Sequence, residues 1–243
     1  MKTNIKINLV AFIAIIGCVF SCKNPNPPTP IVRDIYTASM FDGKVTVWKN
    51  GKILFQYEKN INSFYEGLIY VENNDVYTSD NKGTVFQNGQ KKFDIEKNAE
   101  LGTFYCNGMC VSNSDVYLVG YYMNEVQKTS AVVFKNGKPL YLFPCAYGLN
   151  TNAFSIYVIG NDVYFSGGRQ TIITIPEPSE STMSIIWKNG EEIMTSSTNL
   201  SIFGNGNNIY YLVGKGNNEA DVYKNGQYFF NHNYYEYVYW VLS

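Results

Sequence analysis

The chain has 243 residues and a formal net charge of −1 at pH 7, and aromatic residues make up 16% of it. This length suits one all-β domain behind an N-terminal leader, and the near-neutral charge excludes the basic surface typical of nucleic-acid-binding proteins. The 21 tyrosines favour strands over helices.

Residues 1–21 read as a bacterial lipoprotein signal peptide. Lys2 and Lys6 give a positive start, and the apolar stretch at residues 9–20 is shorter than the about 20 residues that a membrane-spanning helix needs. The stretch ends in Val19-Phe20-Ser21-Cys22, which resembles the lipobox of bacterial lipoproteins. The resemblance implies cleavage before Cys22 and lipidation of its sulfur. An ordinary signal peptide is the alternative.

Residues 22–31 are rich in proline and cannot form a helix or a sheet. We expect an extended, lipidated tether that holds a single domain at residues 32–243 away from a membrane surface. The expected location is the bacterial outer membrane or another envelope membrane. Lys23 and Asn24 are not acidic, so the leaflet, and hence a periplasmic or surface-exposed position, stays open.

Two short signals alternate along the domain, and each occurs five times. The first is a turn containing Asn or Asp, followed by a β-branched residue and Tyr, and the second is an Asn-Gly dipeptide. Asn-Gly between apolar runs predicts a type I′ hairpin turn, which needs positive φ at both central residues, and the Asn/Asp segments also tolerate left-handed backbone. The first signal ends at Tyr36, Tyr77, Tyr117, Tyr164 and Tyr210, and the second lies at Asn50-Gly51, Asn88-Gly89, Asn136-Gly137, Asn189-Gly190 and Asn225-Gly226.

The fourth repeat is the most complete. It predicts strands at residues 153–159, 163–167, 183–188 and 191–196, which form a four-stranded antiparallel meander. Five such units span about 210 residues, or about 42 each, and four-stranded repeats of this length are typical of propeller blades.

The two ends of the repeat array complement each other. The strand at Tyr36 follows the tether directly, so the first unit lacks its innermost strand, whereas residues 234–242 form a surplus strand at the end. Sharing a blade between the two ends removes open sheet edges. We therefore expect an all-β, five-bladed β-propeller with four-stranded antiparallel blades, its ring closed by the C-terminal strand completing the first blade. A sandwich or an irregular repeat is the alternative.

Residues 153–164, followed by Trp187-Lys188-Asn189-Gly190, resemble a family of bacterial β-propeller repeats with the pattern Gly-Asn-Asp-Val-Tyr … Trp-Lys-Asn-Gly. The resemblance covers nearly all of the chain after residue 21 and is weaker in the second repeat, where Gln87 replaces Lys. It implies a propeller in a secreted or lipid-anchored protein, and it transfers no catalytic residue.

Loops of unequal length predict the face that carries a binding site. Turns after the first and third strands of a blade lie on one face, and the loops after the second and fourth strands lie on the other. From the repeat Tyr to the next Asn-Gly the spacing ranges from 11 residues (77 to 88) to 25 (164 to 189), and function tends to lie in variable loops. The longest loop is expected at residues 169–182 and the next at residues 121–125. The candidate ligand-binding residues on this face are Phe64, Tyr65, Phe104, Tyr105, Tyr121, Tyr122, Asn124 and Tyr147, and packing between blades is the alternative for each aromatic.

Several reactive residue types recur in ways that favour structure over chemistry. The repeated Asp34, Asp75, Asp115 and Asp162 are interpreted as turn formers rather than metal ligands or acids. Cys106 and Cys110 lie four residues apart in one strand, about 13 Å at about 3.3 Å per residue, which is too far for a disulfide. We expect buried free thiols, and Cys145 pairs with one of them only if neighbouring strands bring them together.

No catalytic residue, cofactor or metal site is predicted. His232 is the only histidine and is expected in the loop before the last strand. The leading hypothesis is a non-catalytic binding module that is held at the membrane by its lipid and takes a polysaccharide or an envelope protein, with no role for nucleic acid. One alternative is a glycoside hydrolase that uses Glu66 and Glu236 as the two carboxylates. Another is a scaffold subunit of an envelope complex.

Overall fold

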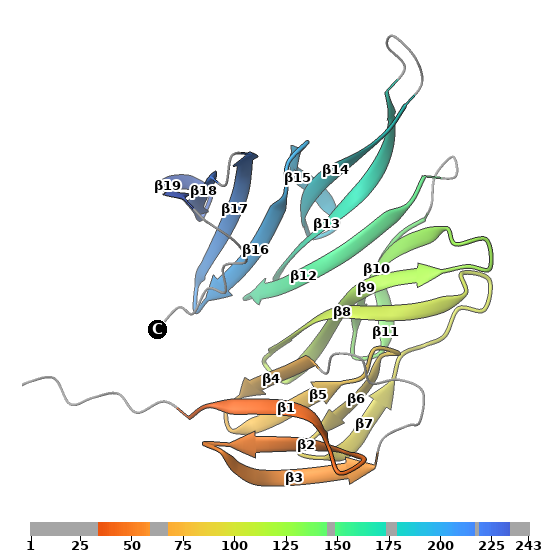
Figure 1. The fold of residues 1–243 in the computed structure, drawn as a ribbon, viewed down its shortest axis with the longest axis vertical. Helices are drawn as coiled ribbons and strands as arrows, with labels where there is room; N and C mark the ends of the chain where they lie inside the picture. Colours follow the sequence, from red (N-terminus) through yellow and green to blue (C-terminus); the bar gives the residue numbers. More distant parts are fainter. Residues whose placement is uncertain (1–33, 59–67, 145–148, 174–178, 217–218, 234–243) are drawn as a thin grey trace, which may run out of the picture. The chain divides into compact units, whose positions relative to one another are not determined.

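The computed structural model describes residues 34–58, 68–144, 149–173, 179–216 and 219–233. The chain divides into a unit of residues 1–35 and a unit of residues 36–243, and all strands lie in the second. The described residues contain no helix and form five antiparallel sheets (Figure 1). Consequently none of them belongs to a helix with the length and apolar character needed to cross a membrane. The all-β class is confirmed.

Each sheet is a meander whose strands follow the order of the chain. The first sheet has three strands and the other four have four strands each, as the repeat predicts for the described residues. The surplus strand predicted at residues 234–242 lies outside the described residues. The strands are β1 (Tyr36–Phe41), β2 (Lys44–Lys49) and β3 (Lys52–Glu58); β4 (Leu68–Glu72), β5 (Asp75–Ser79), β6 (Thr84–Gln87) and β7 (Gln90–Asp94); β8 (Thr103–Ser112), β9 (Asp115–Met123), β10 (Thr129–Lys135) and β11 (Lys138–Phe143); β12 (Thr151–Ile159), β13 (Asp162–Ile173), β14 (Ser179–Lys188) and β15 (Glu191–Ser196); and β16 (Leu200–Asn205), β17 (Asn208–Gly216), β18 (Glu219–Lys224) and β19 (Gln227–Asn233).

The Asn-Gly dipeptides form the predicted two-residue turns. In the third sheet Lys135 pairs with Lys138, which leaves only Asn136 and Gly137 in the loop. Their φ angles are 50° and 81°, the left-handed values that a type I′ turn requires. The other four Asn-Gly dipeptides have φ between 51° and 86°.

Two segments predicted as loops are strands instead. Residues 121–123 belong to β9, and most of residues 169–182 belongs to a long hairpin in which β13 and β14 remain paired out to Ile173 and Ser179. β-Branched residues such as Thr171 and Ile172 favour the extended backbone, so the pairing continues beyond the repeat. Residues 174–178 of the expected long loop lie outside the described residues.

Side chains between consecutive sheets form the core. Tyr77 and Val85 of the second sheet pack with Leu118 and Phe134 of the third, and equivalent clusters join the third to the fourth and the fourth to the fifth. Burying an apolar side chain of this size stabilises the fold by about 1.5–3 kcal/mol. The first strands of consecutive sheets contact each other in chain order, from β1 through β4, β8 and β12 to β16.

A repeated contact between an aromatic ring and a glycine also joins neighbouring sheets. A Cβ atom added to Gly89, Gly137 or Gly190 would lie within 2.9–3.0 Å of the ring of Phe55, Phe93 or Tyr141, respectively. Each ring lies on the last strand of the preceding sheet, four residues after that sheet's own Asn-Gly glycine. The glycine therefore has two roles, because it allows the positive φ and leaves room for the ring.

Candidate functional site

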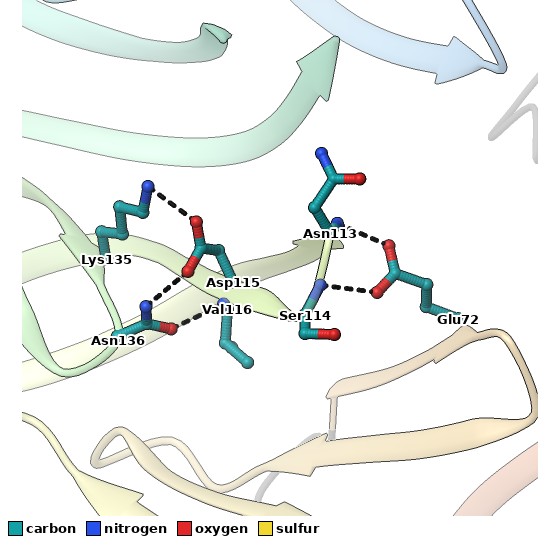
Figure 2. A network of polar contacts seen from close by, with 7 residues as sticks. All are labelled: Glu72, Asn113, Ser114, Asp115, Val116, Lys135 and Asn136. Carbon is teal, nitrogen blue, oxygen red and sulfur yellow. Dashed lines mark hydrogen bonds and ion pairs between the residues drawn. The ribbon is translucent and has the colours of Figure 1, made fainter. Parts of the chain in front are cut away.

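On the face that carries the short turns, the asparagine of the Asn-Gly turn is hydrogen-bonded to the first residues of the second strand in the same sheet. Figure 2 shows the third sheet, where Asn136 accepts a hydrogen bond from the Val116 N–H at 2.9 Å and donates one to Asp115 at 2.7 Å. The Asn136 backbone N–H also donates to the Val116 carbonyl. Asn88 and Asn189 make the same three bonds in their own sheets, and Asn225 makes them with the side chain of Asn208 in place of an aspartate.

In the third and fourth sheets the lysine before the Asn-Gly turn completes this network. Lys135 lies 2.7 Å from Asp115 (Figure 2), and Lys188 lies 2.7 Å from Asp162. The ammonium of Lys135 holds the pKa of the Asp115 carboxyl below its usual range, and Lys188 does the same for Asp162. In the second sheet Gln87 stands in for lysine and donates to Asp75 at 2.9 Å.

The repeated aspartates are therefore strand residues rather than turn residues. Asp75, Asp115 and Asp162 each begin the second strand of a sheet, after the turn, and accept bonds from the second hairpin. Their carboxylates are occupied by partners within the sheet, which leaves them poor candidates for acid–base chemistry. Asp34 precedes β1.

Glu72 binds the neighbouring sheet on the same face. Its two carboxylate oxygens accept hydrogen bonds from the N–H groups of Asn113 and Ser114 at 2.9 Å each (Figure 2). Both turn residues have positive φ, which aims their N–H groups at the same anion. Polar groups on this face are thus used to hold the sheets together.

Two of the candidate ligand-binding residues lie in the core. Phe104 and Tyr122 are only 4% and 2% exposed and pack against Phe134, with ring centroids 5.1 and 6.2 Å from it. The Tyr122 hydroxyl donates to the Glu96 carbonyl. Phe104 and Tyr122 therefore pack in the core between sheets, which is the alternative to ligand binding given for each aromatic. Phe64, Tyr65 and Tyr147 lie outside the described residues.

Tyr105 and Tyr121 come together near the variable-loop end of the third sheet. Their rings stack with centroids 5.4 Å apart, and the Lys82 ammonium lies 3.9 Å from the centroid of Tyr105. Both tyrosines are half-buried. Asn124 instead closes the β9–β10 turn, where its side-chain oxygen accepts the N–H groups of Val126 and Lys128.

A pocket of about 430 Å³ between the fourth and fifth sheets contains hydroxyl and amide groups together with an aromatic ring. Phe154 is 50% exposed at this pocket. Ser155 and Ser166 share a hydrogen bond of 2.6 Å. No charged side chain lines the pocket among the described residues. Its lining consists of Phe154, Ser155, Ser166, Gly167, Ser184, Asn199, Leu200, Ser201 and Ile202.

A β-bulge places Phe154 at this pocket. Ala153 pairs with Gly167 and Ser155 pairs with Ser166, so Phe154 is the extra, unpaired residue of β12. Bulges re-aim a side chain and are frequent beside functional sites. At the bulge of β8 the extra residue is Asn107, whose side-chain amide donates to the Ala153 carbonyl at 2.7 Å. Sequence reasoning missed Phe154 because it lies within the repeat pattern, where nothing local distinguishes a bulge from a regular strand residue.

The structure describes Cys106, Cys110 and the backbone of His232. Cys106 and Cys110 are free, as predicted, and burial raises the pKa of the Cys106 thiol to about 12. Cys145 lies outside the described residues. His232 lies in strand β19 opposite Ala220, whereas a loop was expected, because the pairing of β18 with β19 runs to Asn233.

The described residues contain no group of three or more His, Cys, Asp or Glu side chains that could hold a metal ion. Glu66, Glu236 and Cys22 lie outside the described residues.

Comparisons with known proteins identify no relative by sequence. No family model matches the chain, and no curated protein matches it. Among solved structures, the crystal structure of the computationally designed Ika8 protein is similar, with a TM-score of 0.49 and 14% sequence identity. The match covers 84% of this chain and 60% of that one.

Proposed function

We propose that this protein is a non-catalytic binding module that takes a neutral glycan in the pocket beside Phe154. The observation that carries the proposal is the combination of an exposed aromatic ring with a lining of serines, one asparagine and no charge. A volume of about 430 Å³ lies in the range of small-molecule sites. Hydroxyl and amide groups can both donate and accept hydrogen bonds, which suits a polyhydroxyl ligand.

The ring and the hydroxyls have complementary roles in this proposal. The face of Phe154 would cover the apolar C–H face of a sugar, and the hydroxyls of Ser184 and Ser201 would bond its rim. A charged sugar would bring an anion into a pocket that offers no cation. The proposal therefore predicts preference for uncharged over acidic polysaccharides.

Replacing Phe154 by Ala tests the proposal. Burying a phenyl ring against a ligand contributes about 1.5–3 kcal/mol, and each 1.4 kcal/mol is about tenfold in affinity. We expect Phe154→Ala to weaken binding of a glycan selected on an array by about tenfold or more, measured by titration calorimetry of the purified protein.

Tyr228→Ala is the matched control, because Tyr228 is 59% exposed and follows the last Asn-Gly turn, away from the pocket. It should leave glycan affinity unchanged. An array without any bound neutral glycan, together with capture of one defined envelope protein by crosslinking, would contradict the proposal and favour the scaffold alternative.

We also propose that lipidated Cys22 displays this module at the bacterial envelope. The lipobox-like Val19-Phe20-Ser21-Cys22 supports this. Lipidation at this motif implies two or more acyl chains, which is the number that stable anchoring needs. We expect Cys22→Ala to move the protein from the membrane to the soluble fraction, as followed by fractionation and mass spectrometry. Cys18→Ala should stay membrane-bound, and a Cys22→Ala protein that also stays there would contradict the anchor.

Finally, we propose that the five sheets are the blades of a propeller closed by residues 234–242. The three-stranded first sheet supports this, since β1 has only β2 as a hydrogen-bonded neighbour among the described strands. A strand added beside β1 would give all five sheets four strands.

A further inference from the structure

The geometry points to a second binding site, for a small carboxylate with an apolar body, in a pocket between the second and third sheets. This pocket has a volume of about 290 Å³ and is separate from the pocket beside Phe154. It is lined by Lys82, Ile95, Lys97, Asn98, Ala99, Gly102, Thr103, Phe104 and Tyr122.

The walls of this carboxylate pocket are apolar and firmly packed. Ile95, Phe104 and Tyr122 are 2–5% exposed and belong to the core cluster that joins the two sheets. Gly83 approaches Ile95 so closely that an added Cβ would lie 2.9 Å from its side chain. The walls are therefore preformed, and an apolar ligand body would enter without moving them.

The charges that line the pocket are all positive among the described residues. Lys82 and Lys97 are the two charged residues of the lining, and no carboxylate belongs to it. Glu96 and Glu100 belong to the same connecting segment, are exposed, and do not line the pocket. An anionic head group at this position would meet two cations.

The turn that carries Lys82 is fixed by internal bonds. The Asp80 carboxylate is buried and accepts the N–H groups of Lys82 at 2.9 Å and Thr84 at 2.8 Å. Beyond the turn, the ring of Tyr105 holds the Lys82 ammonium at 3.9 Å from its centroid. Tyr105 is in turn stacked on Tyr121, so this pair of tyrosines acts as a support for the lysine rather than as an open platform.

The size and lining favour one class of ligand. About 290 Å³ is at the lower end for small-molecule sites, which excludes a long acyl chain or an extended sugar. A glycan would leave hydroxyls facing Ile95 and Phe104 without partners, and burying polar groups unpaired is unfavourable. A short-chain or medium-chain carboxylate satisfies both the walls and the lysines.

Octanoate is the probe for the test, with octanol as its uncharged counterpart. We expect the full-length protein to bind octanoate at least tenfold more tightly than octanol in calorimetric titrations. Octanoate should shift the amide resonances of residues 95–103 in NMR spectra. Lys82→Met and Lys97→Met keep the apolar stems and should each reduce this preference at least threefold.

Lys138→Met is the matched control, because Lys138 is exposed on β11 in the third sheet and does not line the pocket. It should bind octanoate as the unaltered chain does. Equal affinity for octanoate and octanol, unchanged binding by both lysine variants, or resonance shifts located elsewhere would each overturn the inference. None of these outcomes depends on glycan binding beside Phe154.

Discussion

At the scale of single residues, the asparagine of each Asn-Gly turn does more than adopt positive φ. Asn136 satisfies the N–H of Val116, which is fully buried, and also binds Asp115. Leaving a buried N–H without a partner costs about 1–3 kcal/mol. The side chain of this asparagine therefore contributes to stability separately from its backbone.

We expect Asn136→Ala to destabilise the protein more than Asn113→Ala does. Asn113 has nearly the same φ, 54° against 50°, so both changes carry the same penalty of about 1–2 kcal/mol for a left-handed alanine. Only Asn136→Ala also removes the bonds to Val116 and Asp115. The difference should be about 1–3 kcal/mol in the free energy of unfolding, measured with urea. Equal losses would show that the side-chain bonds contribute nothing.

At the scale of elements, the aromatic ring that lies over the turn glycine at Gly89, Gly137 and Gly190 connects one sheet to the hairpin of the next. Gly137 lies against Phe93 of the preceding sheet, and an added Cβ would be 2.9 Å from the Asp94 carbonyl oxygen. Gly226 has almost the same φ, 82° against 81°, but an added Cβ there would meet none of the described residues within 4 Å. Comparing an alanine substitution at the two glycines therefore separates the free-energy cost of positive φ from the cost of the close contact.

We expect Gly137→Ala to cost about 1–3 kcal/mol more than Gly226→Ala, because overpacking a tight contact has that magnitude. Thermal or urea unfolding of the two variants gives the difference. Similar costs for both would mean that the ring of Phe93 moves aside freely and that the contact does not join the sheets.

Local turn chemistry explains how much of the fold could be predicted. The Asn-Gly dipeptides predict their turns because their φ angles depend on the two residues alone, and regular spacing of the turns predicts five meanders. The ends of β9 and β13 could not be predicted in this way, since the turn signals do not indicate how far beyond the repeat two strands remain paired. Extended pairing with β10 and β14 determines that they are strands.

The candidate sites were less predictable than the fold for a related reason. Aromatic side chains at the variable loops are candidates for either ligand contact or packing between blades, and Phe104 and Tyr122 fill the core between sheets. Phe154 is exposed only because the register between β12 and β13 shifts at Ala153 and Ser155. Such a shift depends on the pairing of two strands, which the sequence of one strand does not reveal.

At the scale of the whole molecule, the repeated ring–glycine contact provides a test of ring closure. The ring over Gly89, Gly137 or Gly190 lies four residues after the glycine of the preceding sheet. In the last sheet that position is Phe230, four residues after Gly226. If the fifth sheet neighbours the first in a closed ring, Phe230 would lie over Gly51.

Gly51→Ala therefore reports on closure without altering residues 234–242. Gly51 has φ of 75°, and a Cβ added to it would meet nothing within 4 Å of the described residues. In an open array Gly51→Ala should cost the same as Gly226→Ala. In a closed ring we expect about 1–3 kcal/mol more, and Phe230→Ala should remove the excess in a double-mutant cycle, because the added methyl then has room. Equal costs with no coupling between positions 51 and 230 would contradict closure by the last sheet.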